Sequence, residues 1–259
     1  MKCDAWVPET LDAFMKEVTD ACDGMGAGVT IRYKQTLDFL PLAQVGAAER
    51  CLDIGCGPGQ GFPAITAKGY RPLGLDLNPD FARPAMVFTA DVRDMREVFV
   101  DGYFAAVTLV QALYLDGHDQ LVKAFKEVKR VLMPGKPFIV YAGLHSKSIN
   151  PAFATFQKAI TDLAGEPVRS EKSKQIKRTF ESEGDPARDP GEVKAAMADA
   201  GFSPVEETTV GGFYQHLGVA INATRPNRCG RAIATLCFGL KDSQLDEKFP
   251  LATVTRGIA

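Results

Sequence analysis

The fold is decided by residues 50–61, which read Arg-Cys-Leu-Asp-Ile-Gly-Cys-Gly-Pro-Gly-Gln-Gly. The first five residues form a short apolar segment, and glycines follow at alternate positions, Gly55, Gly57 and Gly59. Glycine adopts backbone angles that are closed to other residues, and a helix that begins after such a turn directs free N–H groups at an anion. The stretch therefore predicts a strand, a tight turn and a helix that hold a ligand against the main chain.

The spacing of these glycines does not fit the motifs of two common ligand sites. A dinucleotide fingerprint, G-x-G-x-x-G, would require glycine at Gln60 or at Phe62, depending on the register. A phosphate-binding loop would require Gly-Lys-Ser/Thr after the turn, and none follows. What remains is a glycine turn preceded by an acid, Asp53, two residues before Gly55.

Downstream of the turn, short apolar runs alternate with amphipathic ones. The clearest helix is 119–132, where apolar residues recur at helical spacing until Met133-Pro-Gly135 stops it. This alternation is typical of an α/β protein with a parallel, doubly wound sheet. We expect strands at 50–54, 72–76, 86–89, 104–110, 137–143, 203–210 and 215–224, and helices at 9–22, 30–44, 60–68, 119–132 and 191–200.

Acids stand at the ends of the first three expected strands. Asp53 ends the first, Asp76 ends the second, and Asp91 follows the third. In a doubly wound sheet, ligands bind at the carboxyl ends of the strands. Carboxylates there can accept hydrogen bonds from ribose hydroxyls or from an adenine amine. Taken singly, Asp76 also suits an NAD ribose and Asp91 a helix cap.

The chain resembles the class I S-adenosylmethionine (SAM) methyltransferases, which carry an acid-x-Gly-x-Gly-x-Gly motif and an acid at each of these three places. Here the motif is Asp53, Gly55, Gly57 and Gly59. The resemblance covers about 50–145 and 191–225 and is strongest to the small-molecule, methyltransferase type 11-like branch. It implies a Rossmann-like, seven-stranded sheet with the last strand antiparallel, helical lid insertions, SAM as cofactor, and an enzyme that methylates a small molecule by in-line displacement.

The same resemblance implies roles for individual residues. The methionine part of SAM would lie against Asp53 and the turn residues Gly55, Cys56, Gly57 and Gly59. Asp76 with Leu77 would hold the ribose, Asp91 with Val92 the adenine, Gln111 would line the methyl-transfer face, and Tyr33 would cover the ligand. Cys56 and Tyr33 suit core packing equally, since buried cysteine behaves as a small hydrophobe.

Candidate bases for the methyl acceptor are few. His145 follows the fifth expected strand, while Tyr114 and His118 follow the fourth, and all three would face the ligand edge. Either histidine also suits the surface. An Asn/Asp-Pro-Pro-aromatic motif, which holds a planar amino nitrogen, is absent after the fourth strand, so adenine-N6 and glutamine-amide acceptors are not expected.

Composition limits the partners and the compartment. The chain has 259 residues, is 46% hydrophobic and 24% charged, and carries a net charge of -2, which gives no global attraction for nucleic acid or anionic membrane. Six cysteines lack the spacing of metal ligands or of a redox pair. No apolar run reaches the roughly 18 residues of a spanning helix. We expect a cytoplasmic protein without a bound metal whose partner is a small molecule.

We expect one domain over 1–259. Its parts are an N-terminal helical lid (1–45), the SAM-binding core (50–145), a lid insertion (146–190), the C-terminal part of the sheet (191–225) and a C-terminal extension (226–259). In the extension, 230–240 has an apolar face that offers a homodimer interface. The charged run 169–178 suits either a solvated helix face or the steering of an acidic substrate.

Two other functions are compatible with parts of this pattern. An NAD(P)-dependent oxidoreductase would share the glycine turn and Asp76, but it has no need of an acid at Asp91. A non-catalytic, SAM-binding regulatory protein would share the whole motif.

Overall fold

The computed structural model describes residues 26–115, 117–144, 187–212, 214–215, 217–218, 221, 237 and 250–259. The helix predicted at 9–22, the charged run 169–178 and nearly all of 230–240 lie outside these residues. Within the described part, no helix combines the length and the apolar character needed to cross a membrane.

A seven-stranded sheet forms the centre of the described part, in the order β3-β2-β1-β4-β5-β7-β6. Parallel pairing joins β1 through β5, whereas β7 is antiparallel to both of its neighbours. This confirms the predicted doubly wound sheet with its last strand antiparallel. The strands are β1 (Arg50–Ile54), β2 (Arg71–Asp76), β3 (Val87–Thr89), β4 (Ala106–Val110), β5 (Pro137–Gly143), β6 (Val205–Val210) and β7 (Ala252–Ile258).

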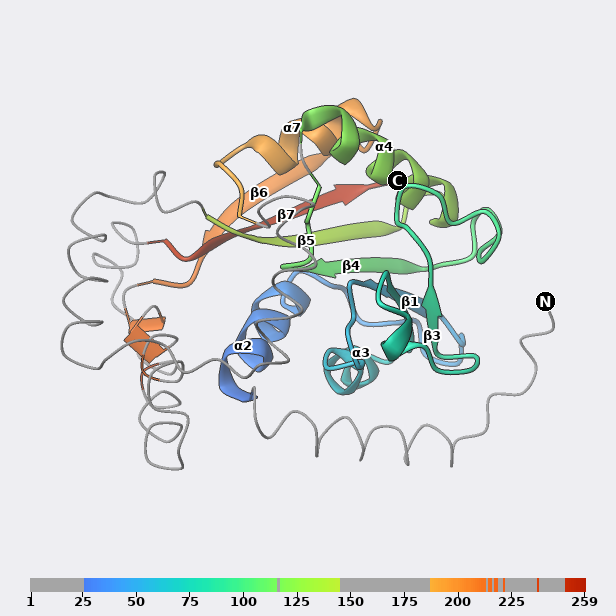
Figure 1. Ribbon diagram of the computed structural model, residues 1–259, viewed down its shortest axis with the longest axis horizontal. Helices are drawn as coiled ribbons and strands as arrows, with labels where there is room; N and C mark the ends of the chain where they lie inside the picture. Colours follow the sequence, from blue (N-terminus) through green and yellow to red (C-terminus); the bar gives the residue numbers. More distant parts are fainter. Residues whose placement is uncertain are drawn as a thin grey trace.

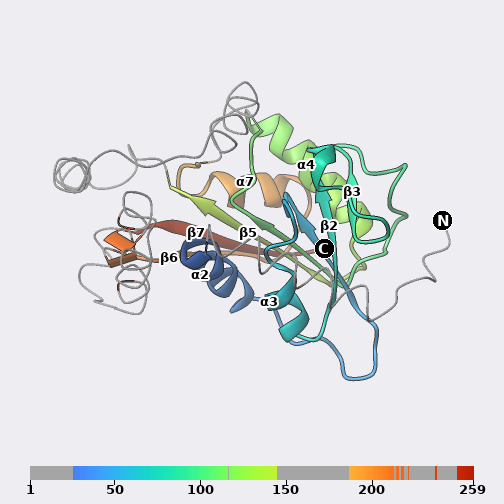
Figure 2. The same cartoon turned by 60° about the horizontal axis from the view of Figure 1, so that its bottom comes forward.

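Helices cover both faces of this sheet. Figures 1 and 2 show α4 and α7 together on one face, and α2 and α3 on the other. The described helices are α2 (Gly26–Leu37), α3 (Phe62–Ala67), α4 (His118–Val131) and α7 (Glu192–Asp199), with a short 3-10 helix η1 (Pro79–Phe81) after β2.

The central strands β1, β4 and β5 bury both of their faces, so they are mostly apolar rather than alternating with polar residues. Leu52 of β1 and Phe138 of β5 pack in one core cluster with Phe125 of α4. Their chain neighbours Cys51 and Ile139 belong to a second cluster, which also contains residues of α2 and α3. The two clusters lie on opposite faces because successive side chains of a strand point to opposite sides.

The last predicted strand is wrong, and the sheet therefore extends further along the chain than expected. The strand expected at 215–224 is absent from the described residues there, which are helical at 214–215, 217–218 and 221. The seventh strand is β7, Ala252–Ile258, within the segment predicted to be an extension. Its alternation of threonine with Val254 and Ile258 suits a strand with β-branched side chains, but it is short and contains Gly257.

The strand order creates the site. Chain order runs outward from β1 to β2 and β3 on one side and then returns to β4 on the other. The two halves diverge at β1, and ligands of such sheets bind in the crevice at the carboxyl ends of the strands at this point. Residues 55–61, 77–81, 90–93 and 111–115 follow these strand ends.

Candidate functional site

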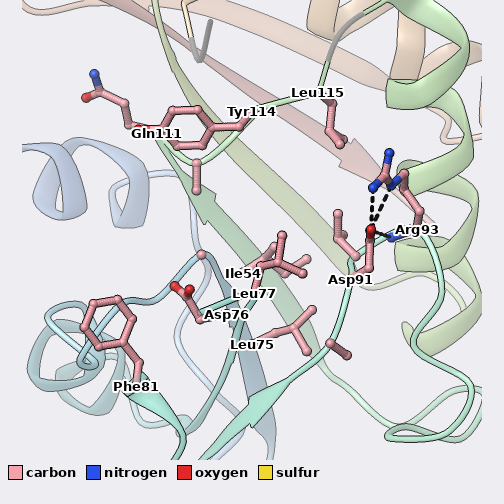
Figure 3. A pocket seen from close by; sticks show the side chains of 14 residues that line it. Ile54, Leu75, Asp76, Leu77, Phe81, Asp91, Arg93, Gln111, Tyr114 and Leu115 are labelled. Carbon is pink, nitrogen blue, oxygen red and sulfur yellow. Dashed lines mark hydrogen bonds and ion pairs between the residues drawn. The ribbon is translucent and has the colours of Figure 1, made fainter. Parts of the chain in front are cut away.

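A cavity of about 240 Å³ opens at the carboxyl ends of β1 to β4. Figure 3 shows its lining side chains, with Asp76 and Leu77 near its base, Asp91 and Arg93 at one side, and Gln111 with Tyr114 at the opposite rim. The lining residues are Ile54, Gly55, Leu75, Asp76, Leu77, Phe81, Ala90, Asp91, Val92, Arg93, Gln111, Ala112, Tyr114 and Leu115. The cavity therefore combines apolar walls with a few convergent polar groups, as small-molecule sites do.

The glycine turn is held against the end of β2. The main-chain N–H of Gly55 donates to the carbonyl of Leu75 at 2.7 Å. Gly55 has a φ of 68°, and a Cβ added there would lie 2.1 Å from the Cβ of Ala112. Both the backbone angle and the close approach of the loop after β4 therefore require glycine at this position.

Asp76 joins the turn to β2. Its Oδ2 accepts from the N–H of Gly57 at 2.8 Å, and its Oδ1 accepts from the N–H of Asn78 at 2.9 Å. Burial raises the pKa of this carboxyl, and hydrogen bonds from the backbone oppose that rise. Each oxygen keeps a further lone pair, so the carboxylate can still accept hydroxyl groups of a ligand.

Asp91 is paired with Arg93 from the same loop. The guanidinium Nε lies 2.9 Å from Oδ1 of Asp91, and Nη2 lies 2.5 Å from Oδ2. These hydrogen bonds lower the pKa of the Asp91 carboxyl. Nη1 of Arg93 also donates to Oε1 of Gln120, at 3.2 Å, which anchors the guanidinium to α4. Asp91 is thus an ionised acceptor held in one orientation at the cavity wall (Figure 3).

Asp53 lies beneath the turn rather than in the cavity. Its side chain is fully buried and is absent from the cavity lining. Tyr33 of α2 donates its hydroxyl to Oδ2 at 2.8 Å, and Thr108 of β4 donates to Oδ1 at 2.9 Å. Both carboxyl oxygens therefore have partners inside the protein, and the acid links α2, β1 and β4.

Burial dominates the electrostatics of this group. It raises the pKa of Asp53 to about 7, although the hydrogen bonds from Tyr33 and Thr108 lower it. Burial and the neighbouring Asp53 also raise the pKa of the Tyr33 hydroxyl well above its usual value. The tyrosine consequently remains a neutral donor.

Tyr33 packs directly on the end of the turn. A Cβ built on Gly61 would lie between 2.0 and 2.6 Å from three carbon atoms of the Tyr33 ring. Gly61 is therefore the residue that allows α2 to approach β1 closely enough for the hydrogen bond to Asp53. The sequence reasoning did not single out Gly61, because its φ is ordinary and the constraint comes from a helix 28 residues upstream.

Cys56 packs behind the turn. It is 3% exposed, and its thiol donates to the carbonyl of Gly57 at 3.3 Å. Its Sγ would lie 2.3 Å from a Cβ on Gly74, so the sulfur rests on the backbone of β2. Burial raises the pKa of this thiol well above its usual value, which leaves it protonated and unreactive.

Gln111 has an uncommon backbone conformation at the cavity rim. Its φ is 53°, in the left-handed region that favours glycine, and its N–H donates to the carbonyl of Tyr141 at 2.9 Å. The side-chain Nε2 lies 3.5 Å from the position of a Cβ on Gly143, at the end of β5. Such conformations concentrate at functional sites.

The candidate bases have different surroundings. Tyr114 lines the cavity. His118 does not; it begins α4, and its Nε2 lies 2.8 Å from Oδ2 of Asp199 in α7, with both side chains exposed. His145 lies outside the described residues.

Several lining residues were not predicted. Arg93 and Phe81 are the main ones, with Ile54, Leu75, Ala90, Ala112 and Leu115. Arg93 lies two residues after Asp91. This spacing allows a local ion pair between guanidinium and carboxylate, and it could have drawn attention to Arg93. Phe81 is placed by η1, which Asn78 caps by accepting from the N–H of Asp80 at 3.0 Å; no motif marks it. In the part of the chain that the structure describes, no group of three or more histidine, cysteine or acidic side chains could hold a metal ion.

Comparison with known proteins shows what this part of the chain is similar to. Residues 52–140 match a family model described as a methyltransferase domain. No curated protein sequence matches the chain. A SAM-dependent methyltransferase from Archaeoglobus fulgidus is similar in structure, with a TM-score of 0.57 and 14% identity, over 92% of this chain and 97% of that one.

A second solved structure has the same fold. Geranyl diphosphate C-methyltransferase from Streptomyces coelicolor A3(2), in complex with Mg²⁺, geranyl-S-thiolodiphosphate and S-adenosyl-L-homocysteine, is 17% identical. The match covers 88% of this chain and 75% of that one, with a TM-score of 0.55. Residues 52–140 are thus a methyltransferase domain, and the chain around them has the fold of the SAM-dependent methyltransferase to which it is similar in structure.

Proposed function

We propose that this methyltransferase acts on a small-molecule acceptor by in-line displacement, with SAM held in the cavity at the ends of β1 to β4. The observation that carries the placement of SAM is the convergence of Asp76, Asp91 and Gly55, the first glycine of the turn, on one cavity. The acceptor class is supported by the net charge of -2, which provides no general attraction for nucleic acid. The Streptomyces enzyme of the same fold was also solved with a small molecule bound.

The lining fits the parts of SAM. Asp76 retains lone pairs for two ribose hydroxyls, and the aliphatic side chains of Leu75 and Leu77 flank it. Asp91, whose ionised form Arg93 stabilises, would accept a hydrogen bond from the exocyclic amine of adenine, with Val92 beside it. The absent side chain of Gly55 leaves the turn backbone open to the methionine part. Asp53 and Tyr33 would act from beneath, by fixing the turn and β1.

The chemistry needs little from the protein beyond position. Bound SAM supplies a methyl group that its sulfonium makes electrophilic. The residues of this chain hold the ligand, orient the acceptor and exclude water. We assign Gln111 and Tyr114 to the acceptor side of the cavity, where an amide and a phenol could hold a polar group of the substrate. A hydroxyl acceptor would need a base, for which Tyr114 and His145 remain candidates, whereas a neutral amine would need none.

Calorimetry with S-adenosylhomocysteine tests the site. Asp76→Ala removes a partly buried acceptor and leaves its ligand partners without a hydrogen bond. We expect a loss of about 1–3 kcal/mol, which is about 5- to 150-fold in Kd. Asp80→Ala, at a nearby exposed carboxylate outside the cavity lining, is the control and should bind as the wild type does. Equal binding by Asp76→Ala and wild type would remove Asp76 from the site.

Transfer of labelled methyl groups tests the acceptor class. Wild-type protein would be incubated with methyl-labelled SAM and a cell extract divided into small-molecule, protein and RNA fractions. We expect label in the small-molecule fraction and none with Asp76→Ala at a SAM concentration well below its raised Kd. Label found in the protein or RNA fraction instead would contradict the proposed acceptor.

A further inference from the structure

Arg188 is a buried arginine outside the cavity lining. It lies four residues before α7 and is 5% exposed. Its main-chain N–H donates to the carbonyl of Gly143, at the end of β5, at 2.8 Å, and it forms an isolated parallel bridge with Leu144. The backbone therefore brings this guanidinium to the carboxyl edge of the sheet, beside the loop that follows β4.

The guanidinium binds that loop through its carbonyl groups. Nη2 of Arg188 donates to the carbonyl oxygens of Leu113 and Leu115, each at 2.6 Å. Nη1 donates to the carbonyl of Ala187 at 3.0 Å, and Nε lies 3.7 Å from a carboxylate oxygen of Glu192 in α7. A planar guanidinium offers several donors in fixed directions, and a charged donor makes shorter and stronger hydrogen bonds than a neutral one.

The loop that Arg188 binds has no regular structure of its own. Residues 112–115 belong to neither β4 nor α4, so their buried carbonyl groups depend on partners from elsewhere. The same loop supplies Gln111, Ala112, Tyr114 and Leu115 to the cavity, as Figure 3 shows for its labelled members. Tyr114 lies between the two carbonyl groups that Arg188 holds, so the path of the backbone on both sides of it is fixed.

We propose that Arg188 is a positioning residue, which sets the 111–115 loop as a wall of the SAM cavity. The inference rests on the proposed function, because it assigns that loop to the ligand. Arg188 acts through Tyr114 and Leu115 and does not touch the ligand. The alternative is a purely structural role, in which the arginine only joins α7 to the end of β5. In the positioning role, loss of order in the 111–115 loop lowers the affinity for the ligand; in the structural role it does not.

The test combines Arg188→Lys and Arg188→Met with a matched control. Lysine keeps the charge but cannot reproduce the planar set of donors, and methionine keeps an unbranched apolar stem. Arg50→Lys is the control, because Arg50 is a half-buried arginine at the start of β1, at the amino end of the strands and away from the cavity, where it stacks 4.5 Å from the Tyr103 ring centroid. Each protein would be assayed by thermal unfolding, S-adenosylhomocysteine calorimetry and hydrogen exchange of the 111–117 peptide.

We expect both Arg188 variants to exchange faster than wild type within 112–116 and to lose S-adenosylhomocysteine affinity by about tenfold or more, the usual size of lost hydrogen bonds to a charged group. Arg188→Lys should recover part of the affinity relative to Arg188→Met, and Arg50→Lys should keep both properties even if it melts earlier. Wild-type affinity in either Arg188 variant, or an affinity loss in all three variants that follows their melting temperatures, would overturn the positioning role.

A failure of the proposed site would look different. If wild-type protein did not bind S-adenosylhomocysteine at all, the placement of SAM would fail. The exchange rates would then decide alone whether Arg188 orders the loop, because that measurement needs no ligand. Unchanged exchange in Arg188→Met would overturn the inference in that case as well.

Discussion

At the scale of single residues, Asp53 shows how one acid of a motif can serve the protein rather than the ligand directly. It is the acid of the glycine motif, yet it is fully buried and accepts hydroxyl groups from Tyr33 and Thr108. Its pKa is raised to about 7, because burial disfavours the carboxylate more than the two hydroxyl groups favour it. The group therefore binds a proton more tightly in the folded than in the unfolded protein.

This difference predicts a pH dependence of stability. Below about pH 4 both states are protonated at Asp53, and its contribution to the free energy of unfolding is fully present. From about pH 4 to about pH 7 only the unfolded state is ionised, so stability falls as the pH rises; above that range both states are ionised and the slope vanishes.

The asparagine of Asp53→Asn cannot ionise, so this variant should lack the part of the pH dependence of stability that Asp53 causes. We expect the stability difference between pH 4.5 and pH 7.5 to be larger in wild type than in Asp53→Asn by more than about 1 kcal/mol. Urea unfolding at both pH values measures it, and the other titrating groups cancel because both proteins contain them. Parallel pH profiles for the two proteins would show that Asp53 keeps an ordinary pKa in the folded state.

At the scale of elements, α2 packs against the end of β1 through the contact of Tyr33 with Gly61, which only glycine permits. Gly61→Ala would place a methyl group within the ring of Tyr33, so the helix or the turn must shift. We expect a destabilisation of about 1–3 kcal/mol, the usual cost of overpacking. Tyr33→Ala removes the obstructing ring, so the same glycine substitution should cost much less in that background.

A double-mutant cycle of Tyr33→Ala and Gly61→Ala measures this coupling by chemical unfolding. Residues in contact typically couple by about 0.5–3 kcal/mol. Additive effects of the two substitutions would mean that the turn relaxes without moving Tyr33, and that the contact does not hold α2 in place.

Individual elements also show what could be predicted from the sequence. The ranges expected for β1 and β5 coincide with the observed ones, because each is a short apolar run bounded by polar residues, glycine or proline. Gly55, Asp76, Leu77, Asp91, Val92, Gln111 and Tyr114 were named from motif and position, and all line the cavity. These residues lie at or just after strand ends, which meet at one edge of the sheet, and the resemblance to a family assigned their roles.

The remaining features depend on contacts that are distant in the sequence. Arg93 pairs with Gln120, Asp53 pairs with Tyr33, and Arg188 binds carbonyl groups more than 70 residues away. Carbonyl groups carry no residue identity, so no pattern of residue types could have marked the partners of Arg188. For the same reason, His118 looked like a base, although its observed partner, Asp199, lies in a helix 81 residues later.

At the scale of the whole molecule, the sheet is completed by the latest of its strands. β7 pairs with β5 on one side and with β6 on the other, over seven and six residue pairs respectively. Sequence order therefore differs from spatial order at this edge, where β7, and not a strand at 215–224, pairs with β6.

The position of β7 has a consequence for synthesis on the ribosome. Once residues up to Gly143 have emerged, the strands β1 to β5 can assemble, and β5 then presents an open edge. β6 cannot cover that edge, because β7 must lie between them, and β7 emerges more than 100 residues after β5 ends. At about 5–20 residues per second, the nascent chain keeps an unpaired strand edge for several seconds. We infer that the chain is more exposed to edge-to-edge aggregation and to capture by chaperones during this interval than after folding is complete.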